Sequence, residues 1–263
     1  MMEAERRARG RAALNAAIRR MNCEEPKVDA TRSFLCIGHR GARGHAPENT
    51  LLSIEKALSL GADWVEVDVH PLEGELVVIH DETVERTTDG RGPLSSFTLE
   101  ALRRLDAGDG QRIPLLEEVL DLLKGRAGLV VEMKGKGSAP LLASAWREAL
   151  RSGWDSRSLT ASSFHAGELR TLRAACPAAS LAVLATGLGK ETLALAREIG
   201  ASAVHLGLRG ASDRALERCR EAGFPVFVFT VNELSDIRRM YDRGAAGVFT
   251  DYPERVARAL AAH

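Results

Sequence analysis

The stretch Trp64-Val65-Glu66-Val67-Asp68-Val69-His70 places two carboxylates one residue apart inside a run of strand-forming side chains. Side chains of a strand alternate between its two faces, so Glu66 and Asp68 point to the same side. Apolar residues surround the pair, and two neighbouring anions that are shielded from water are costly unless a cation neutralises them. The stretch therefore predicts a buried strand that ends at a cation site.

A second apolar run, Gly128-Leu129-Val130-Val131-Glu132-Met133-Lys134, also ends in a carboxylate. Three carboxylates without a cysteine ligand suit a hard divalent ion, Mg²⁺ or Ca²⁺, better than zinc or copper. The alternative is that these are charged strand ends paired with lysine or arginine. An acid-x-acid pair on one strand face is poorly explained by a structural ion pair, so we favour the metal.

Outward from these two runs, short apolar segments alternate with alanine-, leucine- and arginine-rich segments of helical periodicity. The apolar segments are continuous rather than alternating, which is typical of parallel strands covered on both faces. Eight such strand–helix units predict an α/β fold, a (β/α)8 TIM barrel. A doubly wound sheet is the alternative, but no G-x-G-x-x-G follows the first strand. The predicted strands are 34–38, 64–69, 129–133, 159–162, 181–185, 203–208, 226–231 and 247–250.

The domain organisation follows from the same pattern. Residues 1–32 are predicted to form a helical or frayed N-terminal extension, and residues 33–263 a single catalytic barrel. One connection is unusually long: an insertion at about 71–114 contains a further apolar run, Leu76 to His80. Long insertions in compact domains are usually functional, and this one would rise from the face where the active sites of this fold lie.

Composition narrows the class of protein. The 263 residues contain 36 Lys and Arg against 36 Asp and Glu, which argues against a nucleic-acid binder. No stretch approaches the ~20 apolar residues of a membrane span, so no stable membrane insertion is expected. The four cysteines are scattered, which favours reduced thiols and a cytoplasmic location. The sequence leaves a homo-oligomer open.

The first predicted strand runs into Gly38-His39-Arg40-Gly41, whose glycines allow a tight turn against a ligand. Arg40 could grip a phosphate through two parallel hydrogen bonds, and Lys134 could reach an anion bound to the metal. His39 and His80 offer a general base for the attacking oxygen and a general acid for the leaving alkoxide. Together these groups suit hydrolysis of a small phosphodiester.

These residues resemble the glycerophosphodiester phosphodiesterase family over about Ile37 to Tyr252. The resemblance implies a barrel with a small insertion after the second strand and hydrolysis of glycerophosphodiesters to sn-glycerol 3-phosphate and an alcohol, in lipid and glycerol metabolism. It implies Glu66, Asp68 and Glu132 as metal ligands, His39 and His80 as the acid/base pair, and Arg40 and Lys134 as phosphate contacts. Phe229 stands where the family often has tryptophan, so it would keep an apolar wall for substrate. The motifs that carry the resemblance are His39-Arg40-Gly41, Pro47-Glu48-Asn49-Thr50, Glu66-x-Asp68, His80-Asp81 with Arg86-Thr87-Thr88-x-Gly90, Glu132-x-Lys134, Thr230-Val231-Asn232 and Thr250-Asp251-Tyr252-Pro253.

Several alternatives stay open. A lysophospholipase D would use the same headgroup chemistry on a lipid, and a non-catalytic barrel would only bind. The sequence does not decide which alcohol is released or which ion is bound. Nor does it decide whether water attacks the diester directly or a cyclic phosphate forms first. Glu48 could orient Arg40 or favour a helix dipole, His70 could line the site or cap the barrel mouth, and Asp251 could cap the last helix.

Overall fold

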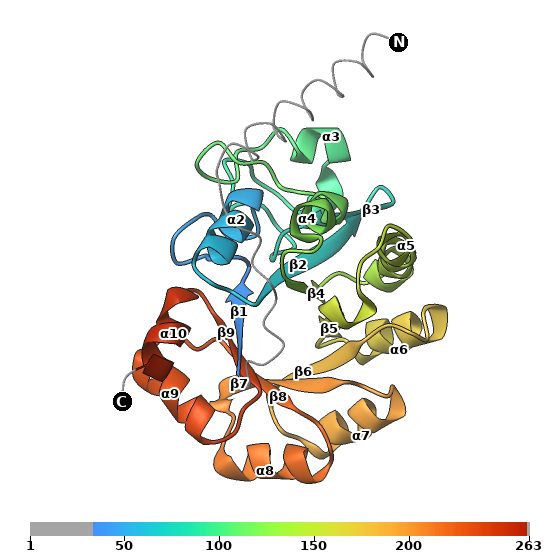
Figure 1. Ribbon diagram of the computed structural model, residues 1–263. Helices are drawn as coiled ribbons and strands as arrows, with labels where there is room; N and C mark the ends of the chain where they lie inside the picture. Colours follow the sequence, from blue (N-terminus) through green and yellow to red (C-terminus); the bar gives the residue numbers. More distant parts are fainter. Residues whose placement is uncertain (1–33, 262–263) are drawn as a thin grey trace.

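A computed structural model describes residues 34–261 of the chain. Eight parallel strands form the centre of the molecule, and helices surround them in a ring (Figure 1). The strands are β1 (Leu35–His39), β2 (Trp64–Leu72), β4 (Gly128–Met133), β5 (Leu159–Ser163), β6 (Leu181–Gly187), β7 (Ala203–Gly210), β8 (Val226–Phe229) and β9 (Gly247–Thr250).

The sheet closes on itself. The strand order is β1-β9-β8-β7-β6-β5-β4-β2, and β1 also pairs with β2. Ile37 lies opposite Phe249 of β9 on one side and opposite Trp64 of β2 on the other. The predicted (β/α)8 TIM barrel is therefore confirmed. The doubly wound alternative is wrong, because β1 and β2, the two ends of this strand order, pair with each other, whereas an open sheet has two unpaired edges.

The helices cover the outside of the barrel with one apolar face each. In α4, buried Leu116, Val119 and Leu123 follow the spacing of three and four residues that puts side chains on one helix face. In α2, the hydroxyl of Thr50 accepts a hydrogen bond from the amide of Ser53 and so caps the helix start. The outer helices are α2 (Leu51–Ser59), α4 (Leu116–Leu123), α5 (Ser138–Arg151), α6 (Ala166–Ala175), α7 (Lys190–Glu198), α8 (Asp213–Glu221), α9 (Leu234–Asp242) and α10 (Glu254–Ala261).

Between β2 and α4 the chain leaves the barrel. Strand β3 (Glu75–Val78) pairs antiparallel with β2, and a 3-10 turn η1 (Leu94–Ser96) and a short helix α3 (Leu99–Leu102) follow. This segment has a small apolar core of its own. The amide of Ile79 donates to the Asp68 carbonyl at 3.1 Å, so the chain passes directly beside the end of β2. The core consists of Val77, Ile79, Val84, Leu94, Leu102, Ala107 and Ile113.

Two further features concern membrane-spanning helices and the cysteines. Among residues 34–261, no helix combines the length and the apolar character needed to cross a membrane. Cys36, Cys176 and Cys219 are buried in the structure. Cys23 and the predicted N-terminal extension, residues 1–32, lie outside the described residues.

Candidate active site

Three carboxylates meet at the end of two neighbouring strands. Glu66 and Asp68 come from β2 and Glu132 from β4, and one oxygen of each lies within 4.8 Å of the others. The strand register explains the meeting, because Asp68 lies directly opposite Glu132. All three residues are buried. The alternation of β2 thus puts both of its carboxylates on the face toward Glu132, as the sequence pattern requires.

The cluster is electrostatically costly without a cation. Burial, together with the neighbouring charge of Asp68, raises the pKa of Glu66 well above its ordinary value and that of Glu132 to about 7. Asp68 Oδ1 is buried and accepts no hydrogen bond from the part of the chain that the structure describes. Closely spaced carboxylate oxygens with an unused acceptor are a donor set that fits a hard divalent ion.

Arg40 lies in the turn after β1 with a positive φ of 53°. Its amide donates to Glu66 Oε2 at 2.9 Å, and its Nη1 donates to Glu48 Oε1 at 2.7 Å. Its Nε lies 3.1 Å from Asp68 Oδ2. The guanidinium therefore lies at the rim of the acidic cluster, where it can offset part of the negative charge. Glu48 does orient Arg40, one of the two roles expected for it.

Asn49 fixes the orientation of Asp68. Its Nδ2 donates to Asp68 Oδ2 at 2.9 Å, and its Oδ1 accepts from the Asp68 amide at 3.2 Å. With Oδ2 engaged in this way, the carboxylate turns its other oxygen toward Glu66 and Glu132. Such a partner, which holds a metal-binding side chain without binding the ion, is usual around metal sites.

His39 stands at the end of β1 with a buried support. Its Nδ1 lies 2.7 Å from Asp251 Oδ1, and Asp251 Oδ2 accepts from Asn232 Nδ2 at 2.8 Å. Burial lowers the pKa of His39 below its ordinary value, although the hydrogen bond to Asp251 opposes the shift. A neutral ring whose Nδ1–H donates to Asp251 keeps Nε2 free to accept a proton. The carboxylate that could have capped the last helix is thus bonded to His39 and Asn232.

His80 reaches the site from the segment after β3. Its Nδ1 lies 2.5 Å from Asp81 Oδ1, and its Nε2 lies 3.0 Å from Lys134 Nζ. Lys134 Nζ also lies 3.0 Å from Glu132 Oε1. Burial lowers the pKa of His80 below its ordinary value, although the neighbouring charge of Asp68 and the hydrogen bond to Asp81 oppose the shift. Lys134 thus contacts a metal-ligand candidate and an acid/base candidate at once.

The opposite rim is apolar. Phe229, at the end of β8, packs edge-on against Phe164 and Phe249, with ring centroids 5.9 and 6.4 Å apart. Phe164 is 45% exposed, so an aromatic surface borders the mouth.

His70 lies behind the site rather than in it. The residue is buried, and its Nε2 lies 3.0 Å from the His80 carbonyl oxygen, where it supports the backbone of that segment.

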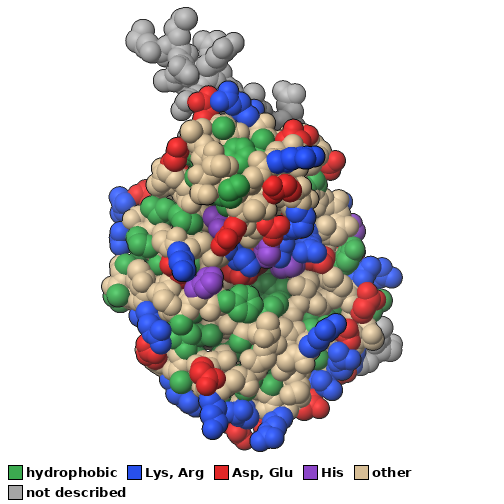
Figure 2. Space-filling model, turned by 180° about the vertical axis from the view of Figure 1, so that it is seen from behind, with side chains coloured by type: hydrophobic (Ala, Val, Ile, Leu, Met, Phe, Trp, Pro, Cys, Tyr) green, Lys and Arg blue, Asp and Glu red, His purple; other side chains and the backbone are tan. Residues whose placement is uncertain are grey.

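Figure 2 shows the face opposite to that seen in Figure 1, where histidine, acidic and basic side chains gather around a hollow. Hydrophobic side chains border it on one side. The structure therefore brings together all the site residues expected from the sequence except Phe229, which belongs to the aromatic rim. The residues at the polar centre are His39, Arg40, Glu66, Asp68, His80, Glu132 and Lys134.

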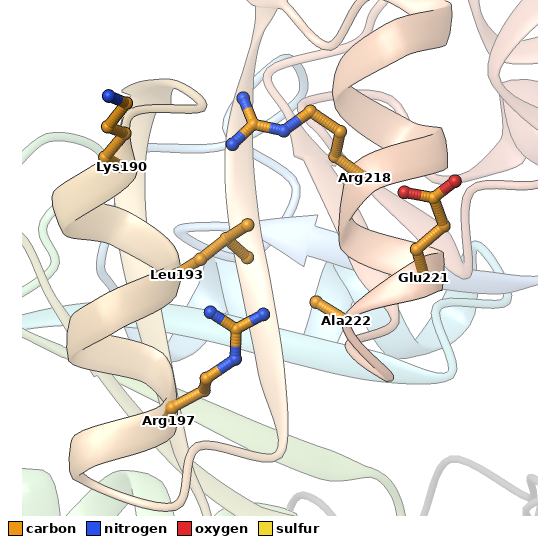
Figure 3. A pocket seen from close by; sticks show the side chains of 6 residues that line it. All are labelled: Lys190, Leu193, Arg197, Arg218, Glu221 and Ala222. Carbon is orange, nitrogen blue, oxygen red and sulfur yellow. The ribbon is translucent and has the colours of Figure 1, made fainter.

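A cavity larger than the one beside Glu48, Asn49 and His80 lies elsewhere. It measures about 320 Å³ and runs between α7 and α8 on the outside of the barrel (Figure 3). Arg197 and Arg218 reach into it from opposite helices. None of its lining residues belongs to the polar centre, so cavity size alone does not identify the site; the convergence of carboxylates, histidines and cations does.

The site is completed by four residues to which the sequence patterns assign no role. Asn49, Asp81, Arg86 and Asn232 stand within quoted motifs, but neither strand alternation nor residue spacing assigns them a role. Each supports another site residue through a side-chain hydrogen bond. The only available signal is their adjacency along the chain to a candidate, because turn residues have no period from which a direction can be read.

Comparisons with known proteins agree with this fold and site. Residues 39–255 match the glycerophosphoryl diester phosphodiesterase family. A glycerophosphodiester phosphodiesterase of Caldanaerobacter subterraneus subsp. tengcongensis is 35% identical, with 84% of this chain and 95% of that protein covered. One of Bacillus altitudinis is 33% identical, with 84% and 96% covered.

Solved structures agree as well. An Oleispira antarctica phosphodiesterase in complex with its product sn-glycerol-3-phosphate superposes with a TM-score of 0.80 and 30% identity, covering 86% of this chain and 96% of that one. These relatives are phosphodiesterases, that is, phosphoric diester hydrolases. The chain belongs to the glycerophosphoryl diester phosphodiesterase family, and it is an enzyme of that class.

Proposed function

We propose that the protein hydrolyses glycerophosphodiesters to sn-glycerol 3-phosphate and an alcohol, with a divalent cation, Mg²⁺ or Ca²⁺, and an acid/base pair of histidines. The observation that carries the proposal is the buried meeting of Glu66, Asp68 and Glu132 between two supported histidines. One oxygen of Asp68 accepts no hydrogen bond from the described residues, and its ion-pair contact with Lys134 Nζ is 4.0 Å long. A cation held by these three carboxylates would supply positive charge to the nonbridging oxygens of the phosphodiester.

The charges of the site favour a singly charged anion. Three carboxylates and one divalent cation together carry about −1, which would repel a phosphodiester. Arg40 and Lys134 change that sum to about +1. Arg40, whose Nη1 and Nε contact Glu48 and Asp68, places a permanent positive charge beside the cluster, and Lys134 presents a compact charge beside Glu132. Both therefore bind the substrate and offset the charge that develops in the transition state.

His39 and His80 divide the proton transfers. Each ring has its Nδ1 bonded to an aspartate, so the Nε2 of each is the atom that exchanges a proton. One histidine takes the proton of the attacking oxygen, and the other gives a proton to the leaving alkoxide. Phe229 and its aromatic neighbours exclude water beside the apolar part of the glycerol group.

The identity of the alcohol is tested with a panel of substrates. Glycerophosphocholine, glycerophosphoethanolamine, bis-glycerophosphate and lysophosphatidylcholine are each incubated with Mg²⁺, Ca²⁺ or EDTA. The product measured is lysophosphatidic acid for lysophosphatidylcholine, which keeps its acyl chain, and glycerol 3-phosphate for the other three. We expect the soluble diesters to release it in the presence of an ion. Turnover confined to lysophosphatidylcholine would instead favour the lysophospholipase D alternative. The cytoplasmic location remains a prediction from the sequence.

A further inference from the structure

Ion pairs run around the rim of the mouth from one histidine to the other. From His80, the run passes to Asp81 at 2.5 Å and to Arg86 at 2.6 Å. Arg86 then binds both oxygens of Glu48, at 2.8 and 2.9 Å. From Glu48 the run continues through Arg43, at 3.9 Å, to Asp251 at 3.3 Å and His39 at 2.7 Å.

Arg86 is the link in this run between two parts of the chain. It lies in the segment between β3 and α3, while Glu48 lies in the loop before α2. All three nitrogens of the guanidinium are engaged: Nε donates to Asp81, and Nη1 and Nη2 donate to Glu48. A guanidinium fork bound to two carboxylates fixes their relative orientation more rigidly than a single charge contact would.

We propose that Arg86 is a positioning residue that orients His80 through Asp81. The inference rests on the proposed function, since it gives His80 a role in proton transfer. Asp81 is partly exposed, so without Arg86 its carboxylate could turn toward water. With Nε of Arg86 holding Oδ2, the other oxygen faces His80 Nδ1 and keeps Nε2 directed toward Lys134 and the site.

Two other roles for Arg86 are less consistent with the contacts. Direct substrate binding would require its guanidinium nitrogens to exchange three existing hydrogen bonds for new ones. A purely stabilising role would give little, because the Arg86 side chain is 47% exposed and Glu48, its more buried partner, also pairs with Arg40. Loss of the residue should therefore change catalysis more than stability.

The test compares Arg86→Gln with a matched control. Arg103, in the same inserted segment, pairs through two nitrogens with Glu118 of α4, at 2.6 and 2.8 Å, and within residues 34–261 its side chain forms no hydrogen bond or ion pair with a site residue. We expect Arg86→Gln to lower kcat about 10- to 100-fold, as the loss of an orienting partner typically does, while KM changes little. Arg103→Gln should keep the kcat of the parent. Arg86→Lys, which keeps the charge and loses the fork, should lie between.

A double-mutant cycle then asks through which residue Arg86 acts. If it acts through His80, Arg86→Gln should cause no further loss of kcat in a His80→Ala background. An equal loss in both backgrounds would overturn the inference. So would an increased KM with unchanged kcat, which would mean that Arg86 attracts the substrate. A fully active His80→Ala variant would refute the proposed function itself, whereas an impaired His80→Ala beside a fully active Arg86→Gln would refute the Arg86 inference alone.

Discussion

The two oxygens of Asp68 have different surroundings. Oδ2 accepts a hydrogen bond from Asn49, whereas Oδ1 is buried without a hydrogen bond from the described residues. An unsatisfied buried acceptor costs about 1–3 kcal/mol, so such atoms persist mainly where a ligand uses them. The asymmetry of this one side chain is the local reason for placing a cation beside it.

Substitution of Asp68 should separate metal binding from folding. We expect Asp68→Asn to abolish ion-dependent turnover and to leave the ion-free protein as stable as the parent or more so, because one charge of a repelling cluster is lost. Activity assays with added ion and thermal melts in EDTA measure both effects. Parent-like turnover in the variant would remove Asp68 from the metal site.

Lys134 has two contacts that imply different roles. If its main role is to offset charge on the phosphate, Lys134→Ala should raise the activation free energy by a few kcal/mol and so lower kcat. The affinity for the ion should then be nearly unchanged. If it mainly holds Glu132, ion affinity should fall and kcat should recover at saturating ion. Calorimetric titration of the ion beside steady-state kinetics distinguishes the two, and the second result would mean that its phosphate role is wrong.

At the scale of elements, the strands and helices could be predicted because their residues repeat with a period. The apolar run Gly128–Met133 indicates a strand. The two carboxylates on Trp64–Leu72 indicate a second strand and the face of it to which both side chains point. The contacts of the loops could not be predicted, since Arg40 and Asn49 adopt positive φ values and the support of His39 by Asp251 joins residues 212 positions apart. Such contacts depend on closure of the whole barrel.

The loop after β9 should therefore matter for catalysis. Asp251→Asn keeps the shape of the side chain but removes the charge that holds His39 Nδ1. We expect kcat to fall by between about 10- and 10⁴-fold, the upper value being that seen when the orienting aspartate of a catalytic triad becomes asparagine. The control is Asp155→Asn, an exposed residue whose partner is Arg157 and which should behave like the parent. Equal kcat values for the two variants would contradict this support.

Close packing at the start of β4 gives a prediction for stability. A Cβ at Gly128 would lie 2.2 Å from the ring of Trp64, so Gly128→Ala forces the ring or the strand to move. We expect a loss of about 1–3 kcal/mol in the free energy of unfolding, typical of overpacking. Gly167 in α6 has no atom within 4 Å of such a Cβ, so Gly167→Ala should be neutral or stabilising in the same denaturant titration. Similar losses for both would show that local crowding is not the cause.

At the scale of the whole molecule, the acidic cluster links stability to pH. The folded-state pKa of Glu66 is raised and that of Glu132 lies at about 7, above the ordinary value of 4.5 that the unfolded chain would show. A carboxyl with a raised folded-state pKa favours folding below its unfolded pKa, and that contribution is lost as the pH rises through the folded value. Histidines with a lowered pKa, His39, His80 and His205, contribute in the opposite direction over the same pH range. In EDTA, the melting temperature of the parent should therefore fall between about pH 4.5 and 7 relative to that of a Glu66→Gln, Glu132→Gln variant, which has the same histidines.

Added ion should reverse this loss, because it binds the ionised carboxylates of the folded state. Melting curves at several pH values, with EDTA and with Mg²⁺ or Ca²⁺, give both trends in one experiment. A difference between parent and variant melting temperatures that does not fall with pH in EDTA, or a parent melting temperature that added ion leaves unchanged near pH 7, would contradict the proposed electrostatics of the cluster.

Reconstitution of the ion-free enzyme tests the proposed mechanism most directly. The protein is stripped with EDTA, freed of chelator, shown by elemental analysis to lack divalent metal, and assayed for glycerol 3-phosphate release from glycerophosphocholine before and after addition of Mg²⁺ or Ca²⁺. We expect no significant turnover before addition and full recovery afterwards in the parent, with no recovery in Asp68→Asn. Full activity of the metal-free protein would contradict the mechanism.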